Sequence, residues 1–342
     1  MSAVDPGTEE VPGTTTRQVR VDHHSAVHLA AETARAVAEE GALPGALPDR
    51  AAVIASELAA NLDKHARDGS LYLQHLPAGE GIEILAVDSG PGIGDLALSL
   101  TDGFSTTGTL GAGLGAVSRI ADEFTIRTEA GGTLMSARMR RPGAPAPHTA
   151  AGVLCLPLEG ESACGDAWAV ADSEEGVTAL VVDGLGHGEQ AAEAAQLARR
   201  HFLREPGRPL PELLTGMHRA LRRTRGAAAG LVRLRAGTAE SCGIGNIRLM
   251  LLDDRRVHAR VTGQPGIVGF TLPVPRVQRL DAPAGASLVL CSDGIDHRWA
   301  DSPSPFLLRL PPPLLAAALC RDRRRTRDDA TALAVRVPGR QP

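Results

Sequence analysis

Aromatic residues and lysine are nearly absent from this chain of 342 residues. Phe, Trp and Tyr together make up only 2% of it, which leaves the cores to Leu, Val, Ile and Ala. Lys64 is the single lysine among 36 basic residues. A skew of this kind is typical of genome base composition, and we base no functional prediction on it.

Long apolar runs are also missing. No stretch approaches the roughly 18–20 apolar residues that a membrane-spanning helix needs. Residues 1–16 are polar and acidic and lack the basic-then-apolar order of a secretory signal, so a disordered tail is expected there. The sequence therefore predicts no membrane partner.

Cysteines are few and show no paired Cys-x-x-Cys spacing, which argues against structural zinc and against a disulfide framework. The five are Cys155, Cys164, Cys242, Cys291 and Cys320. A reducing, cytoplasmic location is the expectation.

Charge is unevenly divided along the chain. Residues 1–148 hold 11 basic and 19 acidic residues, whereas the remainder holds 25 and 21. A mildly basic second half favours phosphorylated or acidic partners. It falls well short of the footprint of a nucleic-acid-binding protein.

A Pro/Gly/Ala-rich stretch at residues 141–151 predicts a linker between two domains, in keeping with the length of the chain. Before it, the apolar periodicity predicts helices at 25–40, 49–67 and 113–121 and strands at 82–87, 124–128 and 133–139. This order favours a two-layer α/β sandwich.

After the linker, strands predominate. They are expected at 167–171, 177–182, 229–234, 247–252, 287–291 and 331–337, with helices near 188–204, 210–224 and 312–320. The overall prediction is an α+β chain of two domains, the second a mainly antiparallel β-sandwich flanked by helices.

Polar residues of the first half fit a nucleotide site. Glu57 and Asn61 are four residues apart and so share one face of a helix. The asparagine oxygen can ligate Mg²⁺, and the glutamate can accept a proton from water or a hydroxyl group. Asp88 follows a buried strand and can accept a hydrogen bond from an adenine amino group.

Glycines after this aspartate let the backbone approach a base and its phosphates. They are Gly90, Gly92, Gly111, Gly113 and Gly115. Alone, each feature is equally typical of an ordinary turn or a solvated helix face, so the prediction of an ATP site depends on their order.

In the second half, aspartates stand where strands are expected to begin or end. They occur as Gly165-Asp166, Asp183-Gly184, Asp293-Gly294 and Asp328-Asp329. In antiparallel sheets such positions can meet at one edge. Divalent cations would relieve the repulsion, and all-oxygen ligands favour Mg²⁺ or Mn²⁺ over zinc. A single Asp-Gly is merely a turn dipeptide, but two Asp-Gly pairs together with a Gly-Asp and an Asp-Asp at strand ends predict a two-metal centre for phosphoryl chemistry.

The first set of motifs resembles the ATP-binding domain of histidine kinases, gyrase and the small anti-sigma switch kinases, over roughly residues 17–140. Residues 103–107, 111–115 and 121–124 are most similar to the switch kinases of the general-stress (stressosome) pathway. The resemblance implies ATP with Mg²⁺ as cofactor, Glu57 as general base and Asn61 as Mg²⁺ ligand.

The second set resembles the SpoIIE-type branch of the metal-dependent Ser/Thr protein phosphatases, over residues 152–337. It implies two Mn²⁺ or Mg²⁺ ions, with catalytic Asp183 among the metal ligands. These ligands would be Asp166, Asp183, Gly184, Asp293 and Asp328, with Asp329 beside them. His187 is expected to hold its loop, and Asn246 to be structural.

Together the two resemblances predict a phosphatase joined to a switch-kinase-like domain, acting on phosphorylated anti-sigma antagonist or stressosome proteins. Two alternatives remain open. The first domain could bind ATP or a partner without transferring phosphate and so regulate the phosphatase, or the chain could be a scaffold with both sites degenerate. The basic run at residues 321–327 fits either a substrate phosphate or a solvated helix end.

Overall fold

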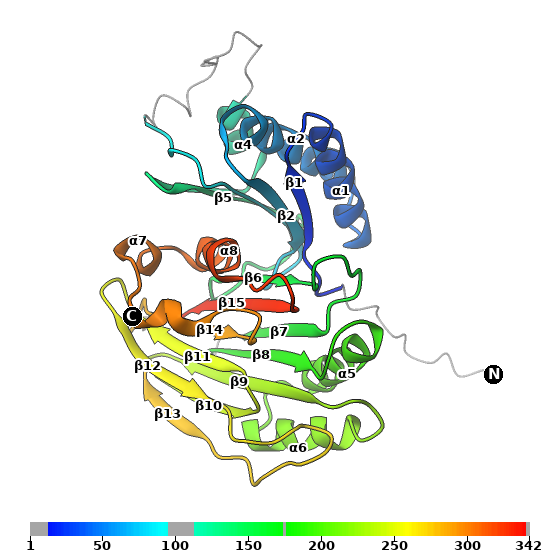
Figure 1. The fold of residues 1–342 in the computed structure, drawn as a ribbon, viewed down its shortest axis with the longest axis vertical. Helices are drawn as coiled ribbons and strands as arrows, with labels where there is room; N and C mark the ends of the chain where they lie inside the picture. The colour runs from blue at the N-terminus through cyan, green and yellow to red at the C-terminus, as the bar shows by residue number, and fades with distance from the viewer. Residues whose placement is uncertain (1–12, 95–112, 174–175, 340–342) are drawn as a thin grey trace, which may run out of the picture.

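The computed structural model describes residues 13–94, 113–173 and 176–339. Three five-stranded antiparallel sheets stack with helices between and around them (Figure 1). Most of the expected tail, residues 1–12, lies outside the described part of the chain, as do Gly111 and residues 103–107.

The first sheet has the strand order β1-β2-β3-β5-β4. Its strands are β1 (Arg17–Val21), β2 (Gly69–His75), β3 (Gly81–Val87), β4 (Glu123–Glu129) and β5 (Gly132–Arg140). The helices α1 (Ala26–Glu40), α2 (Leu47–His65) and α4 (Gly113–Ile120) accompany it. Helices and strands therefore lie within two residues of their predicted bounds, but β1 and β2 were not predicted.

Both faces of this sheet are covered, which explains why β3 is buried along its whole length. Ile84 and Ala86 belong to the core shared with α1 and α2, while Leu85 and Val87 belong to a second core with α8. This alternation follows the period of two in a strand. The helix α8 comes from the far end of the chain, so the two halves share a core.

The second and third sheets pack face to face below α8 (Figure 1). One has the order β12-β11-β14-β15-β6 and the other β13-β10-β9-β8-β7. Their strands are β6 (Ala151–Leu156), β7 (Asp166–Ser173), β8 (Gly176–Gly184), β9 (Ala227–Arg235), β10 (Thr238–Ile244), β11 (Arg248–Leu252), β12 (Val257–Thr262), β13 (Gln278–Asp281), β14 (Ser287–Cys291) and β15 (Ala330–Arg336).

Helices close the outer faces of this sandwich. They are α5 (Glu189–Arg204), α6 (Leu210–Ala220), α7 (Pro305–Leu308) and α8 (Pro312–Arg323), together with the 3₁₀ helix η1 (His297–Asp301). The helices α5 and α6 cover the sheet that contains β8, and α8 covers the sheet that contains β15. The predicted fold class, a two-layer sandwich followed by a helix-flanked β-sandwich, is confirmed.

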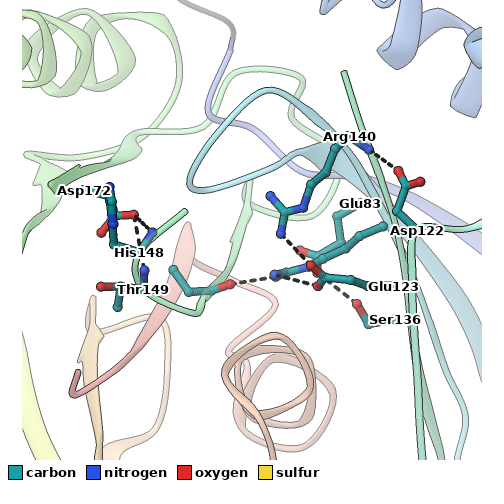
Figure 2. A network of polar contacts seen from close by, with 10 residues as sticks. Glu83, Asp122, Glu123, Ser136, Arg140, His148, Thr149 and Asp172 are labelled. Carbon is teal, nitrogen blue, oxygen red and sulfur yellow. Dashed lines mark hydrogen bonds and ion pairs between the residues drawn. The ribbon is translucent and has the colours of Figure 1, made fainter. Parts of the chain in front are cut away.

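A buried polar network ties the first sheet to β6 (Figure 2). The carboxylate of Glu83, with no exposed surface, accepts from Arg138 Nε at 2.6 Å and from Ser136 Oγ at 3.0 Å. Arg138 also donates to the carbonyl oxygen of Ala151 at 2.6 Å. A buried charge pair of this kind adds little stability but is costly to break, so it favours one fixed arrangement of the two halves.

Residues 141–151, expected as a linker, are hydrogen-bonded near both ends. The backbone N–H of Arg141 donates to Glu80, and Asp172 accepts from the N–H groups of His148 and Thr149. Ala151 is already the first residue of β6. Within the described ranges, no helix combines the length and apolar character that crossing a membrane requires.

Candidate functional site

The aspartates of the second half gather where the ends of the two packed sheets meet. Asp166 and Asp183 are direct partners in the antiparallel pair of β7 and β8. Asp293 follows β14 by two residues, and Asp328 precedes β15 by two. The expectation that Asp166 lies just before a strand was off by one residue, because its backbone already pairs with β8.

Ser292 joins the two sheets at this edge. Its hydroxyl donates to Asp166 Oδ2 at 2.6 Å and accepts from the backbone N–H of Thr331 at 2.9 Å. Asn246, from the loop before β11, donates to Asp293 Oδ2 at 2.6 Å. Both contacts fix carboxylates whose second oxygens remain available.

Burial and mutual repulsion disfavour ionisation here. Burial, reinforced by the charges of Asp166 and Asp293, raises the pKa of Asp183 to about 9. Burial likewise raises the pKa of Asp166 to about 7, although the hydrogen bond from Ser292 opposes this shift. The pKa of Asp328 is raised as well, by burial and by Asp293.

The donor set fits a divalent cation. Asp166 Oδ1 and Asp329 Oδ2 are buried without a hydrogen-bond partner, and no ion pair to Arg, Lys or His satisfies these carboxylates among the described residues. Hard oxygen ligands around uncompensated negative charge favour Mg²⁺ or Mn²⁺. In the described part of the chain, no three His, Cys, Asp or Glu side chains already converge at ligand spacing.

Glycines let the backbone close in around the aspartates. A Cβ on Gly184 would lie 2.3 Å from the carbonyl oxygen of Ala191, and one on Gly294 would lie 1.9 Å from that of Asp329. A Cβ on Gly165 would lie 2.6 Å from Asp329 Oδ2. A side chain at Gly184 or Gly294 would require the backbone to move, and one at Gly165 would displace the Asp329 carboxylate.

His187 contacts Glu161, with Nδ1 to Oε1 at 2.5 Å, and is exposed. This contact agrees with the expected loop-holding role. In the basic run, Arg321 donates to the backbone oxygen of Asp88 at 2.8 Å, and Arg324 donates to Gln18 at 3.1 Å. Part of the run therefore contacts the first half of the chain, which neither sequence interpretation anticipated.

In the first half, Glu57 and Asn61 lie one turn apart on α2 and are half-buried. Asp88 is buried, and its Oδ1 accepts from the backbone N–H of Gly90 at 2.7 Å. Gly92 has a positive φ of 83°, and a Cβ there would lie 2.4 Å from the Glu129 carbonyl oxygen. The tight loop expected after Asp88 is therefore present.

Two of the glycines that were expected to approach the nucleotide phosphates lie at the start of α4. Gly113 is its first residue, with φ at 43°, and Gly115 is buried within its first turn. Gly111 lies outside the described residues. The backbone N–H groups at this helix start are the ones that a phosphate would use.

Two residues at the edge that carries the aspartates had a role that the sequence prediction did not recognise. Ser292 was not singled out, although it directly precedes Asp293-Gly294. Asn246 was expected to be only structural, yet it holds one of the predicted ligands. The only sequence signal for these two residues was their position next to motif residues. The aspartate that each of them contacts could not be inferred from the sequence.

Comparison with known families agrees with this division. Residues 173–338 match the family described as Stage II sporulation protein E (SpoIIE), and residues 21–139 match the histidine kinase-like ATPase domain. The chain therefore joins a segment that matches SpoIIE to one that matches a histidine kinase-like ATPase domain, and both predicted resemblances are confirmed. Asp166 lies just outside the matched SpoIIE segment.

Individual relatives give the particulars. The chain is 44% identical over 78 residues to the serine/threonine-protein kinase RsbT of Bacillus subtilis (strain 168), covering 22% of this chain and 59% of RsbT. A structure titled "The bacterial stressosome: a modular system that has been adapted to control secondary messenger signaling" aligns with a TM-score of 0.51 at 30% identity, covering 55% of this chain and 99% of that one.

A third similarity is to the PP2C phosphatase domain and regulatory fragment of SpoIIE from Bacillus subtilis. It covers 80% of this chain and 82% of that one, at 16% identity and a TM-score of 0.45. At these values it has no bearing on function.

Proposed function

We propose that the chain is a Mn²⁺- or Mg²⁺-dependent phosphoserine/phosphothreonine protein phosphatase. The observation that carries the proposal is the set of buried and half-buried carboxylates without ion-pair partners at the edge where β8 and β14 end and β7 and β15 begin, on a segment that matches SpoIIE. Asp166, Asp183, Asp293 and Asp328 would hold the ions, with the Gly184 carbonyl completing the shell. Two bound divalent ions supply Lewis acidity and lower the pKa of an attacking water.

The protein's own groups would prepare this reaction. Ser292 and Asn246 orient Asp166 and Asp293 through hydrogen bonds, as partners behind metal ligands usually do. The closely approaching glycines keep side chains out of the space beside Asp183. The substrates we propose are phosphorylated anti-sigma antagonist or stressosome proteins, supported by the similarity to RsbT and to the stressosome structure. A reducing cytoplasm, where the five unpaired cysteines would stay reduced, is the compartment we propose.

Metal dependence gives the direct test. The purified protein is expected to release phosphate from p-nitrophenyl phosphate and from a phosphoserine protein with Mn²⁺ or Mg²⁺, and to lose at least about 100-fold in rate with EDTA. Restoring the metal should restore the rate. Equal rates with and without chelator would contradict the proposal.

For the first half, we propose ATP binding with serine/threonine kinase activity, in which Glu57 is the general base and Asn61 the Mg²⁺ ligand. Asp88 and the glycines at positions 90, 92, 111, 113 and 115 would hold the nucleotide. Two observations support this proposal: Glu57 and Asn61 lie one turn apart on α2, and a tight loop follows Asp88. The similarity to RsbT, a serine/threonine-protein kinase, also supports it, over 59% of the length of RsbT.

A second candidate function is a regulatory module that binds ATP or a partner and adjusts the phosphatase. One contact favours it. Arg321 of α8 donates to the backbone oxygen of Asp88, the residue expected to accept a hydrogen bond from the adenine amino group. A few residues further on, the N–H of Arg325 donates to the carbonyl oxygen of Gly294, beside Asp293. A single segment therefore touches both sites.

This contact predicts that nucleotide and phosphatase sites influence one another. In the wild type, a non-hydrolysable ATP analogue should change phosphate release from p-nitrophenyl phosphate by about fivefold or more. Arg321→Ala should remove this response and leave the nucleotide-free rate unchanged. The exposed neighbour Arg323, changed to Ala, is the matched control and should respond like the wild type. An unchanged response in Arg321→Ala would exclude this route.

A further inference from the structure

Four large apolar side chains are exposed in the phosphatase half. Phe270 is 62% exposed and Val274 83%, with Val277 at 39% and Leu185 at 38%. Among the described residues only two other large apolar side chains, Leu29 on α1 and Val53 on α2, are comparably exposed. In a chain with five phenylalanines, placing one of them in solvent needs a reason.

Leu185 and Phe270 lie along the same edge as the aspartates of the proposed metal site. Asp183 pairs across the sheet with Ala228, and the next residue, Gly184, pairs with Ala227. Ala227 in turn bridges to Val268, two residues before Phe270. Leu185 donates its N–H to Gly226, and a Cβ on Gly226 would lie 2.9 Å from the ring of Phe270. The apolar residues therefore begin one strand away from Asp183.

The segment that carries them, residues 263–277 between β12 and β13 (Figure 1), has an ordered backbone. Ile267 and Thr271 exchange two backbone hydrogen bonds at 2.9 Å. The side chain of Gln264 fixes the second part of this segment. Its amide group donates to the carbonyl oxygen of Val274 at 3.1 Å and accepts from the N–H of Arg276 at 2.7 Å. Phe270 and Val274 are thus presented by a fixed loop, which lowers the entropy lost on binding.

Positive charge flanks this apolar surface. From Leu213 to Ala239 the chain contains arginines but no acidic residue, and residues 263–277 contain only Arg276 as a charged side chain. Arg225 is exposed, and its Nη1 lies 2.9 Å from where a Cβ on Gly186 would stand, beside the Asp183 loop. No carboxylate pairs with it among the described residues.

We propose that Leu185, Arg225, Phe270 and Val274 form a docking face for the phosphorylated protein substrate. The inference rests on the proposed phosphatase function and specifies what the substrate must offer. With its phosphoryl group at the aspartates, the chain flanking the phosphoresidue lies over this face. An apolar side chain packs on Phe270 and Leu185, and acidic residues pair with Arg225.

Charge and position favour this occupant over two others. A second copy of the chain would bring the same arginines against each other in a symmetric contact, which like-charge repulsion opposes. An anionic membrane on this face would cover the edge at which a protein substrate has to enter. A phosphoprotein is negative and reaches the aspartates and the docking face together.

The test compares two phosphoserine peptides, one flanked by Leu and Glu and the other by Ser and Lys, with p-nitrophenyl phosphate as a substrate too small to reach the docking face. We expect the wild type to favour the Leu/Glu peptide about tenfold in kcat/KM. Phe270→Ser/Val274→Ser and Arg225→Ala should each lose part of the preference for the Leu/Glu peptide, the first through the lost apolar contact and the second through the lost charge pair. Activity on p-nitrophenyl phosphate should stay within about twofold in all variants. Leu29→Ser/Val53→Ser, which alters the other exposed apolar residues, should behave like the wild type.

Unchanged peptide preference, or equal loss on both substrate classes, would overturn the docking face. So would binding of anionic phospholipid vesicles, or a dimer in solution, that is lost in Phe270→Ser/Val274→Ser. If the wild type does not hydrolyse p-nitrophenyl phosphate with Mn²⁺, the phosphatase proposal fails by itself. Fluorescence anisotropy with the two labelled peptides then still measures whether the docking face binds them selectively.

Discussion

Asp183→Asn is expected to reduce phosphate release from a phosphoserine protein and from p-nitrophenyl phosphate by at least about 100-fold. Each ion contributes several kcal/mol of charge stabilisation to phosphoryl transfer, and each 1.4 kcal/mol is tenfold in rate. The charges of Asp166 and Asp293 act on Asp183 and help to raise its pKa, so we propose that Asp183 would be among the residues that hold the ions. Steady-state rates with Mn²⁺ are the measurement.

Asp254→Asn provides the matched control. Asp254 is an exposed aspartate in the turn between β11 and β12, at the opposite end of the sheet from Asn246. It should retain wild-type rates with both substrates. Full activity in Asp183→Asn would show that the proposed metal assignment is wrong.

Asp183→Asn should also change the stability of the fold, and this effect distinguishes loss of catalysis from misfolding. In the metal-free folded protein the pKa of Asp183 is raised to about 9, so its carboxyl stays protonated where an unfolded chain would be ionised. This group stabilises the fold at low pH, and the contribution is lost as pH rises from about 4 towards 9. In EDTA the melting temperature of the wild type should therefore fall more between pH 5.5 and 8.5 than that of Asp183→Asn. Added Mn²⁺ should raise it most at pH 8.5, and only in the wild type.

Glu57→Gln is expected to reduce phosphoryl transfer from ATP to a serine or threonine of a protein substrate by about 100-fold or more, the usual contribution of a general base. Glutamine keeps the size and polarity of the side chain but cannot accept the proton. The assay uses γ-labelled ATP and stressosome or anti-sigma antagonist proteins as acceptors. Placing Glu57→Gln and its parent in an Asp183→Asn background prevents the phosphatase half from removing the label.

Two further measurements make this result decisive. Glu32→Gln, an exposed glutamate on α1, is the control and should transfer at the parental rate. Binding of a fluorescent ATP analogue should survive in Glu57→Gln, because the proposed nucleotide contacts come from elsewhere. Equal transfer by both proteins would remove the general-base role. ATP binding without transfer by the parent would favour the regulatory module.

Local patterns predicted much of the fold. The strand at 82–87 and the helix at 49–67 are continuous apolar or periodic segments, and both occur as β3 and α2. By contrast, β1 is short and alternates Arg and Gln with Val, and β6 follows directly on the Pro/Ala-rich stretch. Such strands are stabilised by neighbours that lie far away in the chain: β6 pairs with β15, nearly two hundred residues on. Nothing local in the sequence signals that partner.

By itself, the sequence determined which residues are candidates for the chemistry: aspartates next to glycines at strand ends, and a glutamate one turn from an asparagine on a helix. These signals are local, because close backbone approach and helical spacing are properties of a few consecutive residues. Only the tertiary structure decided that α8 lies between two sheets, that Arg321 contacts Asp88, and that Ser292 bonds Asp166. These contacts join segments more than a hundred residues apart, and packing of whole sheets and helices, rather than any short motif, sets their distances.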